Sequence, residues 1–477
     1  MLFNSLDFAF FLPIVFVLYW FFFAKALKWQ NVLLLAASYY FYSCWDWRFL
    51  FLLIFSTALD YYSGHKIAQS LHHKKKWLIL SVGINLGFLG VFKYYNFFVE
   101  SFADFLGSFG IQQSYSTLNV ILPVGISFYT FHGLSYVFDV YNNKIKPCDN
   151  WVNYSLFVSF FPLLVAGPIE RATHLLPQVE KPRTFDYGKA IDGLRQILWG
   201  LFKKMVIADN CAKFANVIFE NSADETGSTL ALGALFFTFQ IYCDFSGYSD
   251  IALGTARLFG FELLQNFKFP YFSRDIAEFW RRWHISLSSW FRDYLYFPLG
   301  GSQGSIGLKV RNTFIIFLVS GFWHGANWTF IVWGLLNAIY FLPLLLANKN
   351  RVNLDVVAQG RYLPNLKEVF QMTVTFSLTV IAWIFFRAND LSHAFQYLTS
   401  MFTEQLFTMP TQFPIYLIVL LAFFITVEWL GRANNFAIQK LGFLRFRILR
   451  WGFYTVLLFL IFTFMVTEET PFIYFQF

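Results

Sequence analysis

The chain has 477 residues, of which 57% are hydrophobic and 22% aromatic, whereas only 13% are charged. A soluble domain carries about 25% charged residues, so this chain lacks the polar side chains needed to cover a water-soluble fold of its size. Its mean hydropathy of +0.50 indicates that lipid is its solvent. The net charge of +8 at pH 7 fits the excess of Lys and Arg in the cytoplasmic loops of membrane proteins, and we expect no nucleic-acid partner.

The apolar segments are continuous and near the roughly 20 residues that a membrane-spanning helix needs. This favours helices over a barrel of short alternating strands. The predicted fold is an all-α polytopic membrane protein with roughly eleven transmembrane helices plus re-entrant segments, because some segments are short or carry polar residues. In chain order the segments lie near 7–24, 30–44, 48–62, 77–94, 119–141, 153–167, 191–209, 229–243, 245–262, 312–324, 326–347, 368–387, 414–430 and 450–467.

The first segment follows MLFNSLDFAF, which has no basic residue, so we interpret it as a retained span rather than a signal peptide. Loops rich in Lys and Arg indicate the cytoplasmic side, and this assignment places both termini outside. The stretches rich in Lys and Arg that are assigned to the cytoplasm are 65–76, 171–213, 349–367 and 432–450.

The segment 153–167 has cytoplasmic features at both ends and contains Pro162 and Gly167. It is therefore predicted to be re-entrant, which requires it to be buried in protein or to line a wet cavity.

The sequence contains no internal repeat and no linker that would indicate a second domain, so residues 1–477 are predicted to form a single domain. The four cysteines show no metal-ligand spacing, and we expect no metal.

The longest polar interruption, 266–312, contains a stretch rich in Trp and Arg from Ile276 to Tyr296. On one continuous helix, Trp280, Trp283 and Leu287 would share a stripe. An amphipathic helix lying in the headgroup layer would account for the same pattern, and His284 would then be an interfacial residue.

His324 lies between two strongly apolar runs in FIIFLVSGFWHGANWTFIVWG. An ionisable residue at membrane depth is costly and therefore suggests function, although a hydrogen bond to a neighbouring helix would also explain it. Imidazole has an ordinary pKa of about 6.5, and desolvation keeps it neutral and able to accept a proton. A hydroxyl that attacks an activated acyl group needs such a base. Without a G-x-S-x-G, H-E-x-x-H or P-loop motif, a lone histidine fits better than a triad or a metal.

Other polar residues fall within apolar segments and could line the same cavity. The cluster Asp244–Asp250 is predicted to break a span into two half-helices whose ends contact a ligand, and helix capping by Asp and Ser explains it equally well. The remaining candidates are His132, Asp139, Glu170, Arg171, Gln240, Tyr242 and Tyr248.

The chain resembles the membrane-bound O-acyltransferase (MBOAT) family, and within it the bacterial alginate and polysaccharide O-acetyltransferase subfamily. The signature core covers about 122–334, and the joint presence of FWRRWHISLSSWFRDYLY and GFWHG is highly specific. The stretches that carry the resemblance are LPVGISFYTFHGLSYVFDVY (122–141), FFPLLVAGPIER (160–171), FKFPYFSRDIAEFWRRWHISLSSWFRDYLYFPLGG (267–301), SGFWHGANWTFIVWG (320–334), WIFFRA (383–388) and FIYFQF (472–477).

The resemblance implies that His324 is the catalytic histidine and His284 the second signature histidine. It implies a helical ring around a central funnel in the bacterial inner membrane, where acetyl-CoA arrives from the cytoplasm as a substrate and no cofactor is permanently bound. The acetyl group would pass to an SGNH-type partner outside the membrane, or towards an alginate-like exported polysaccharide. Candidate coenzyme A contacts are Arg281, Arg282, Trp283, Ser286, Arg292 and Trp323.

Several alternatives stay open at the level of sequence. Peptidoglycan O-acetylation, teichoic acid D-alanylation and lysophospholipid acylation belong to the same chemistry, whereas a polysaccharide or lipid transporter would carry out none. Ser320, Ser286 and the cysteines could in principle carry an acyl group, without positive evidence.

Overall fold

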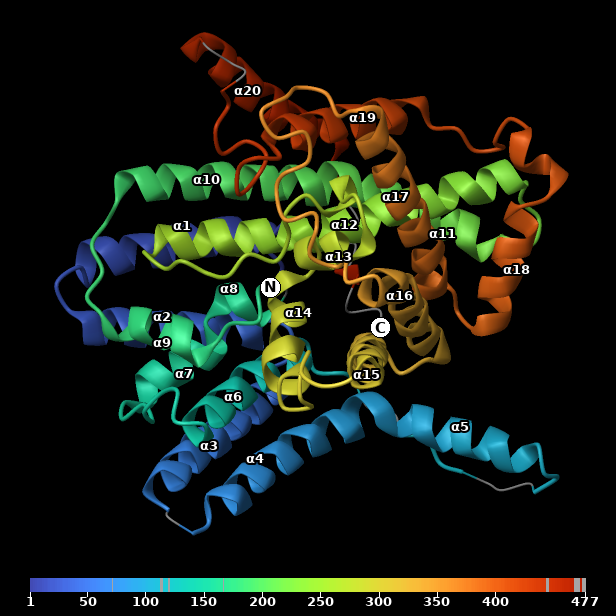
Figure 1. The fold of residues 1–477 in the computed structure, drawn as a ribbon. Coiled ribbons are helices and arrows are strands. Elements are labelled where there is room, and N and C mark those ends of the chain that lie inside the picture. The colour runs from blue at the N-terminus through green and yellow to red at the C-terminus, as the bar shows by residue number, and fades with distance from the viewer. Residues whose placement is uncertain are drawn as a thin grey trace. The chain divides into compact units, whose positions relative to one another are not determined.

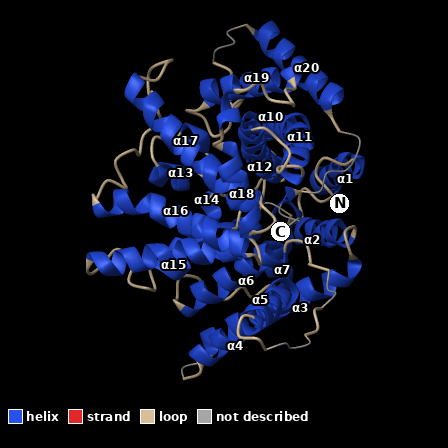
Figure 2. Cartoon of the chain, turned by 90° about the vertical axis from the view of Figure 1, so that its right-hand side faces the viewer, coloured by secondary structure: helices blue, strands red, loops and turns tan. Residues whose placement is uncertain are grey.

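A computed structural model describes the whole chain except residues 71, 112–114, 119–120, 166, 443–445, 467–471 and 474–477, and the side chain at 404. Helices are the only regular elements in this described part (Figure 2), which confirms the all-α prediction. The chain divides into two compact units. Unit 1 is Met1–Ala190 with Thr255–Leu264, and unit 2 is Ile191–Gly254 with Gln265–Phe477. The prediction of a single domain over 1–477 stays a prediction.

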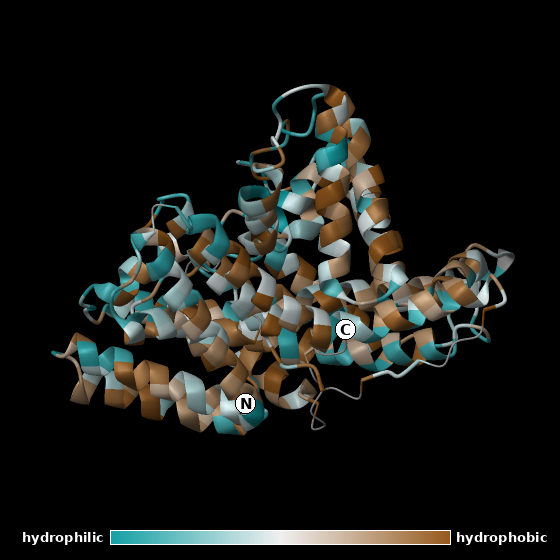
Figure 3. Cartoon of the chain, turned by 90° about the horizontal axis from the view of Figure 1, so that it is seen from below, coloured by the Kyte–Doolittle hydropathy of each residue, from teal (hydrophilic) through white to brown (hydrophobic). Residues whose placement is uncertain are grey.

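Six of the described helical segments are long and apolar enough to cross a membrane, and hydrophobic residues recur along the helices (brown in Figure 3). The chain is therefore a multi-pass membrane protein. The six segments are Lys74–Gly107, Gly227–Leu258, Ile306–His324, Trp328–Leu346, Leu366–Arg387 and Arg447–Phe464, and two shorter apolar helices are Leu6–Phe22 and Ile415–Gly431.

Unit 1 contains the helices before residue 190. They are α1 (Leu6–Val17), η1 (Leu18–Phe22), α2 (Leu27–Ser43), α3 (Trp47–Gln69), α4 (Lys74–Leu89), η2 (Gly90–Tyr94), α5 (Tyr95–Gly107), α6 (Ile126–Tyr141), α7 (Trp151–Ser159), α8 (Phe161–Leu164) and α9 (Ala172–Glu180). The stretch predicted to be re-entrant is broken into α7 and α8, and neither is long enough to span a bilayer. The backbone is thus irregular there, and the re-entrant course stays a prediction.

Unit 2 contains the helices after residue 201, and α10 (Tyr187–Leu201) leads into it. They are η3 (Phe202–Ala208), α11 (Asp209–Glu220), α12 (Gly227–Leu258), η4 (Pro270–Phe272), α13 (Ile276–Arg282), α14 (Ile285–Phe291), η5 (Arg292–Tyr296), α15 (Ile306–His324), α16 (Trp328–Leu346), α17 (Leu366–Arg387), α18 (Leu391–Met401), η6 (Glu404–Phe407), α19 (Ile415–Gly431) and α20 (Arg447–Phe464).

The predicted break at Asp244–Asp250 is wrong, because α12 runs as one helix of 32 residues through this cluster. The polar side chains find partners within unit 2 instead of ending the helix. Asp244 pairs with Lys204 at 2.8 Å, and Asp250 pairs with Lys203 at 2.6 Å. A paired charge is tolerated inside a buried helix, whereas an unpaired one is not.

Helices α15 and α16 lie side by side in unit 2 (Figure 1). Glycines set how closely they approach: a Cβ on Gly321 would lie 2.3 Å from the carbonyl oxygen of Phe330, and one on Gly334 would lie 2.4 Å from that of Phe317. Small residues let membrane helices pack backbone against backbone. This contact positions the end of α15, where His324 lies.

We therefore expect Gly321→Ala to destabilise the protein, because its methyl group has no room against backbone. Overpacking of this kind costs about 1–3 kcal/mol, and thermal unfolding in detergent should show a lowered midpoint. Gly307→Ala, on the same helix, is the matched control, since the nearest atom to its Cβ would be the Ser305 hydroxyl at 3.9 Å. Equal midpoints for the two variants would contradict the proposed close contact.

Candidate active site

His324 is the last residue of α15, and a tight turn fixes it there. Gly325 is extended, with φ −162° and ψ 155°, and the side-chain oxygen of Asn327 accepts the Thr329 N–H at 3.0 Å to begin α16. A Cβ on Gly325 would lie only 2.1 Å from the Phe330 ring. The sequence Gly-Ala-Asn therefore ends one helix and begins the next with the imidazole held between them.

The His324 side chain is buried in aromatic surroundings, since the residue is only 3% exposed. Its ring centroid lies 5.0 Å from Trp323, 5.1 Å from Trp333 and 5.2 Å from Phe386, all in edge-on orientations. Edge-to-face contacts at this separation are the favoured aromatic geometry. They limit how the imidazole can turn and keep bulk water from it.

His284 lies at a sharp break between α13 and α14, so the stretch from Ile276 to Tyr296 does not form the one continuous helix that the amphipathic alternative requires. Its backbone is left-handed, with φ 42°, which is uncommon for a residue with a Cβ. Asn266 holds the break: its carbonyl oxygen accepts the Ile285 N–H at 2.9 Å, and its side-chain oxygen accepts the Ser286 hydroxyl at 2.6 Å. Left-handed residues held in this way cluster at functional sites.

The break brings His284 next to the end of α15. Its ring centroid lies 6.3 Å from that of His324, 5.8 Å from Trp323 and 4.7 Å from Phe245. The residue is 1% exposed, which an amphipathic helix on the membrane surface would not produce. Burial lowers the pKa of His284 to about 3, so its ring is neutral at physiological pH. The two signature histidines, 40 positions apart in sequence, therefore share one buried aromatic environment.

Neither ring nitrogen of His284 has a hydrogen-bond partner in the described part of the chain. Trp383 is similar: its indole N–H is buried and has no described acceptor. Its ring stacks on Trp333 at 5.6 Å and lies 4.9 Å from Trp283. Buried polar groups without protein partners indicate a place where water or a polar ligand binds.

Sequence reasoning missed Trp383, because it used WIFFRA only as a mark of resemblance. One aromatic residue among many in a span carries no signal of its own. Only the packing of α17 against α16 places this indole against Trp333, whose ring contacts His324.

The three arginines predicted to contact coenzyme A lie in different environments. Arg281 donates to carbonyl oxygens of the 350–353 segment at 2.7 and 2.8 Å, and Arg282 donates to Glu278 at 2.7 Å and to the backbone of Asp355 at 2.9 Å. Both therefore tie a loop to α13. The Arg292 side chain is 57% exposed and pairs with neighbouring Asp293, so it is the most accessible of the three.

The other predicted contacts are buried. Trp283 is 0%, Ser286 1% and Trp323 6% exposed. Trp283 and Trp323 form part of the aromatic environment of the histidines, and Ser286 holds the break at His284 through Asn266. These three side chains therefore shape the site from within.

Lys203 and Lys204, which belong to the stretch 171–213 predicted to be a cytoplasmic loop, are 3% and 1% exposed and lie inside the protein. Their ammonium groups form ion pairs with carboxylates on α11 and α12, and Lys204 contacts both Asp209 and Asp244 at 2.8 Å. Asp244 also accepts the Ile473 N–H at 2.7 Å, which anchors the described part of the FIYFQF stretch; residues 474–477 lie outside the described residues.

The polar candidates of unit 1 also have structural partners. His132 Nδ1 lies 3.4 Å from the Val158 carbonyl oxygen, and Asp139 lies 3.5 Å from the Lys144 ammonium. Glu170 accepts the Leu264 N–H at 2.6 Å and contacts His174 at 2.8 Å. These contacts favour structural roles for the three residues.

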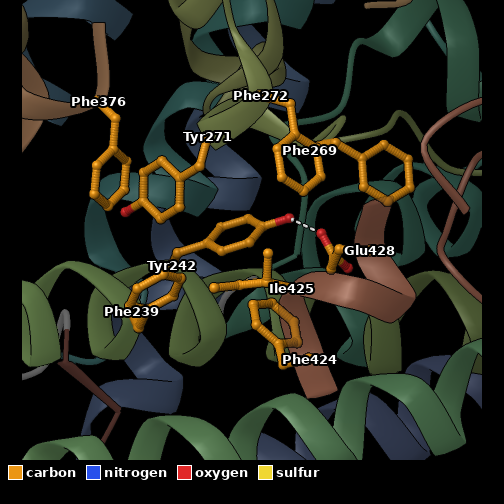
Figure 4. A pocket seen from close by; sticks show the side chains of 9 residues that line it. All are labelled: Phe239, Tyr242, Phe269, Tyr271, Phe272, Phe376, Phe424, Ile425 and Glu428. Atoms are coloured by element: carbon orange, nitrogen blue, oxygen red, sulfur yellow. Dashed lines mark hydrogen bonds between the residues drawn. The ribbon is translucent and has the colours of Figure 1, made fainter. Parts of the chain in front are cut away.

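A cavity of about 310 Å³ lies within unit 2 (Figure 4). Its walls are aromatic and aliphatic apart from Glu428, whose carboxylate accepts the Tyr242 hydroxyl at 2.7 Å and the Trp199 indole N–H at 3.0 Å. A carboxylate repels phosphates, so this cavity suits an apolar group rather than the phosphates of a nucleotide. Its lining residues are Phe239, Tyr242, Phe269, Tyr271, Phe272, Phe376, Phe424, Ile425 and Glu428.

Comparison with known proteins shows the family of the chain. The profile of the membrane-bound O-acyltransferase family matches residues 149–387. The probable alginate O-acetylase AlgI of Pseudomonas aeruginosa is 42% identical over 407 residues, which cover 84% of this chain and 75% of that protein. The AlgI protein of Azotobacter vinelandii is 40% identical over 84% of this chain and 78% of its own length. The peptidoglycan O-acetyltransferase of Helicobacter pylori is 36% identical over 84% of this chain and 80% of its own length.

The chain belongs to the membrane-bound O-acyltransferase family. It is an O-acyltransferase, and it crosses the membrane several times.

The burial of His284 predicts a specific dependence of stability on pH. Because its pKa is about 3 when folded and about 6.5 when unfolded, its contribution is intact above pH 6.5 and is lost as the pH falls towards 3. Between pH 7.5 and 5.0 the wild type should lose about 2 kcal/mol more than His284→Gln, which has no ionisable ring. Chemical denaturation in detergent at the two pH values would measure this, and identical losses would contradict the buried neutral ring.

Proposed function

We propose that the protein transfers an acetyl group from cytoplasmic acetyl-CoA to a hydroxyl group on the opposite side of the membrane, for O-acetylation of an exported, alginate-like polysaccharide. The observation that carries the proposal is the pair His284 and His324, whose rings lie 6.3 Å apart inside a buried aromatic environment. A pair of this kind is suited to proton transfer in a water-poor site.

In the proposed reaction, neutral His324 accepts the proton of the attacking hydroxyl. The hydroxyl oxygen forms a bond to the thioester carbonyl carbon, and the carbon–sulfur bond then breaks. The departing thiolate takes the proton back from His324, so that alcohol and thioester become ester and thiol without net proton release. General-base catalysis of this kind contributes about 10²–10⁴-fold to a rate.

The position of His324 at the C-terminal end of α15 supports this role. The backbone carbonyls at a helix C-terminus stabilise a positive charge, by up to about 2 kcal/mol in partly buried geometries. The imidazole is neutral while it waits for the hydroxyl and becomes charged only when it has accepted the proton. The helix terminus therefore favours the state that forms during the reaction.

His284 and Trp383 are the proposed donors to the negative charge that develops on the thioester oxygen. Each is buried and carries at least one nitrogen without a described hydrogen-bond partner. Fixed donors aimed at developing charge give a large part of catalysis in acyl transfer. The left-handed backbone at His284 supports this role, because it holds the ring against its aromatic neighbours.

We further propose that Arg292 leads the coenzyme A contacts, because it is exposed, whereas Arg281 and Arg282 chiefly hold the loop against α13. Trp283, Ser286 and Trp323 shape the inner part of the same path. The wider arrangement is the one that the resemblance implies: roughly eleven crossings of the bacterial inner membrane, a central funnel and both termini outside. An SGNH-type partner would receive the acetyl group there.

The acceptor is proposed from the relatives. Those that are 40–42% identical over 84% of the chain are described as probable alginate O-acetylases. The peptidoglycan O-acetyltransferase, at 36% over the same share, supports peptidoglycan as the second candidate acceptor. The teichoic acid D-alanyltransferase of Streptococcus thermophilus is 29% identical over 59% of the chain, which favours D-alanylation less.

We expect His324→Ala to lower the O-acetyl content of the exported polysaccharide at least 100-fold, since the reaction loses its base. Mass spectrometry of the polymer from cells that carry the wild type or the variant would measure this. The amount of variant in the membrane fraction must match the wild type, and His73→Ala, at an exposed position before α4, is the control.

Normal acetylation in the His324→Ala strain would contradict the assignment of the base. A transporter without chemistry would instead show altered export with acetylation unchanged. The same cells would identify the acceptor, because loss of acetyl from muropeptides alone would favour peptidoglycan.

A further inference from the structure

A second cavity, of about 270 Å³, lies within unit 1 and is unlike the aromatic one in unit 2. Four segments line it: η1 at the end of the first apolar helix, α9 through Gln178, the stretch 181–189, and the stretch 257–260 at the end of α12. We call it the basic pocket, because the side chains that line it include Lys181, Arg183, Lys189 and Arg257.

The charges of the basic pocket are only partly balanced. Glu262 pairs with Lys189 at 3.2 Å and with Arg257 at 3.1 Å. Asp186 uses its carboxylate to accept the Lys189 backbone N–H at 3.0 Å. Four cationic side chains thus face two carboxylates. Lys181 is exposed and makes no ion pair with any described residue, so the pocket presents net positive charge.

Arg183 gives the pocket a buried, fixed cationic side chain in addition to its surface charges. It is only 8% exposed, and its terminal nitrogens donate to the Asn31 side chain and to the carbonyl oxygens of Gln178 and Val179. Its guanidinium carbon lies 4.6 Å from the centre of the Phe261 ring. The Nε–H, however, has no hydrogen-bond acceptor in the described part of the chain. A buried donor of this kind is costly unless an acceptor from outside the protein binds it.

Aromatic residues around this pocket support a position at the level of the lipid headgroups. The Trp20 indole N–H donates to the Leu258 carbonyl oxygen at 2.8 Å, and its ring lies 5.5 Å from Phe185. Phe185 and Tyr187 are 49% and 72% exposed. Tryptophan and tyrosine at the end of an apolar helix mark the membrane–water interface, which is also where lipid phosphates lie. Basic pockets between helices on the cytoplasmic side bind anionic headgroups.

We propose that the basic pocket binds a phosphate group of an anionic membrane phospholipid of the phosphatidylglycerol type. The phosphate oxygens meet Lys181 and Arg183, and the acyl chains follow the apolar surface of α1. A soluble phosphate compound such as coenzyme A offers the same chemistry, so the test must separate the two sources. The inference does not depend on the proposed acetyl transfer.

The test uses the full-length protein in a neutral detergent, with thermal unfolding followed as ligand is added. The probes are short-chain phosphatidylglycerol, short-chain phosphatidylcholine, inorganic phosphate and coenzyme A. We expect phosphatidylglycerol to raise the unfolding midpoint with saturation, and phosphatidylcholine and inorganic phosphate to leave it unchanged. Coenzyme A, which the proposed active site binds, should shift the midpoint equally in the wild type and in Lys181→Ala. Lys181→Ala should weaken the apparent affinity for phosphatidylglycerol about fivefold, the size expected for one basic contact at a membrane surface.

Lys75→Ala is the matched control, since Lys75 is also an exposed lysine of unit 1 but lies on α4. It should leave the affinity at the wild-type value. Equal weakening by the two substitutions, or equal stabilisation by phosphatidylcholine, would overturn the proposal. Stabilisation by coenzyme A that Lys181→Ala abolishes would also overturn it, because the source of the phosphate would then be soluble.

Discussion

The candidate active site depends on one constraint: an imidazole buried at the end of a membrane helix must be held in place by packing instead of by water. The glycines of α15 and α16 satisfy it by letting the two backbones meet. The turn at Gly325 then leaves His324 at the helix terminus, surrounded by Trp323, Trp333 and Phe386. The proposed catalysis follows from an imidazole that is buried and enclosed by aromatic side chains.

The same logic governs the charges in unit 2. Removing a single ammonium or carboxylate group from water costs several kcal/mol of free energy. The helices around α12 place Lys203 and Lys204 directly against carboxylates. Because these pairs satisfy one another, α12 stays continuous through a stretch of polar residues. His284 differs, since neither of its ring nitrogens has a hydrogen-bond partner in the described part of the chain. This difference separates the paired charges, which stabilise the fold, from His284, which we propose contacts the substrate.

The sequence alone located the residues that local signals reveal. His324 stands out because an ionisable side chain between two apolar runs is visible within a short window, and the broken backbone of α7 and α8 is visible from Pro162 and its flanks. The left-handed break at His284 was not predictable in this way, because it depends on hydrogen bonds to Asn266, 18 positions away. Lys204 and Asp244 were misinterpreted for a similar reason: each looked like an isolated charge until the fold paired them. Trp383 became recognisable only through its contacts with Trp333 and Trp283.

The most direct test of the central claim is a cryo-electron microscopy structure of the wild type with a non-transferable thioether analogue of acetyl-CoA. The account predicts that the carbonyl carbon of the analogue lies beside His324, with room for a hydroxyl oxygen at about 3–3.5 Å from that carbon and within hydrogen-bond reach of the imidazole. It also predicts the carbonyl oxygen on the side of His284 and Trp383. An analogue bound elsewhere, with His324 enclosed by side chains and no passage leading to it, would contradict the account.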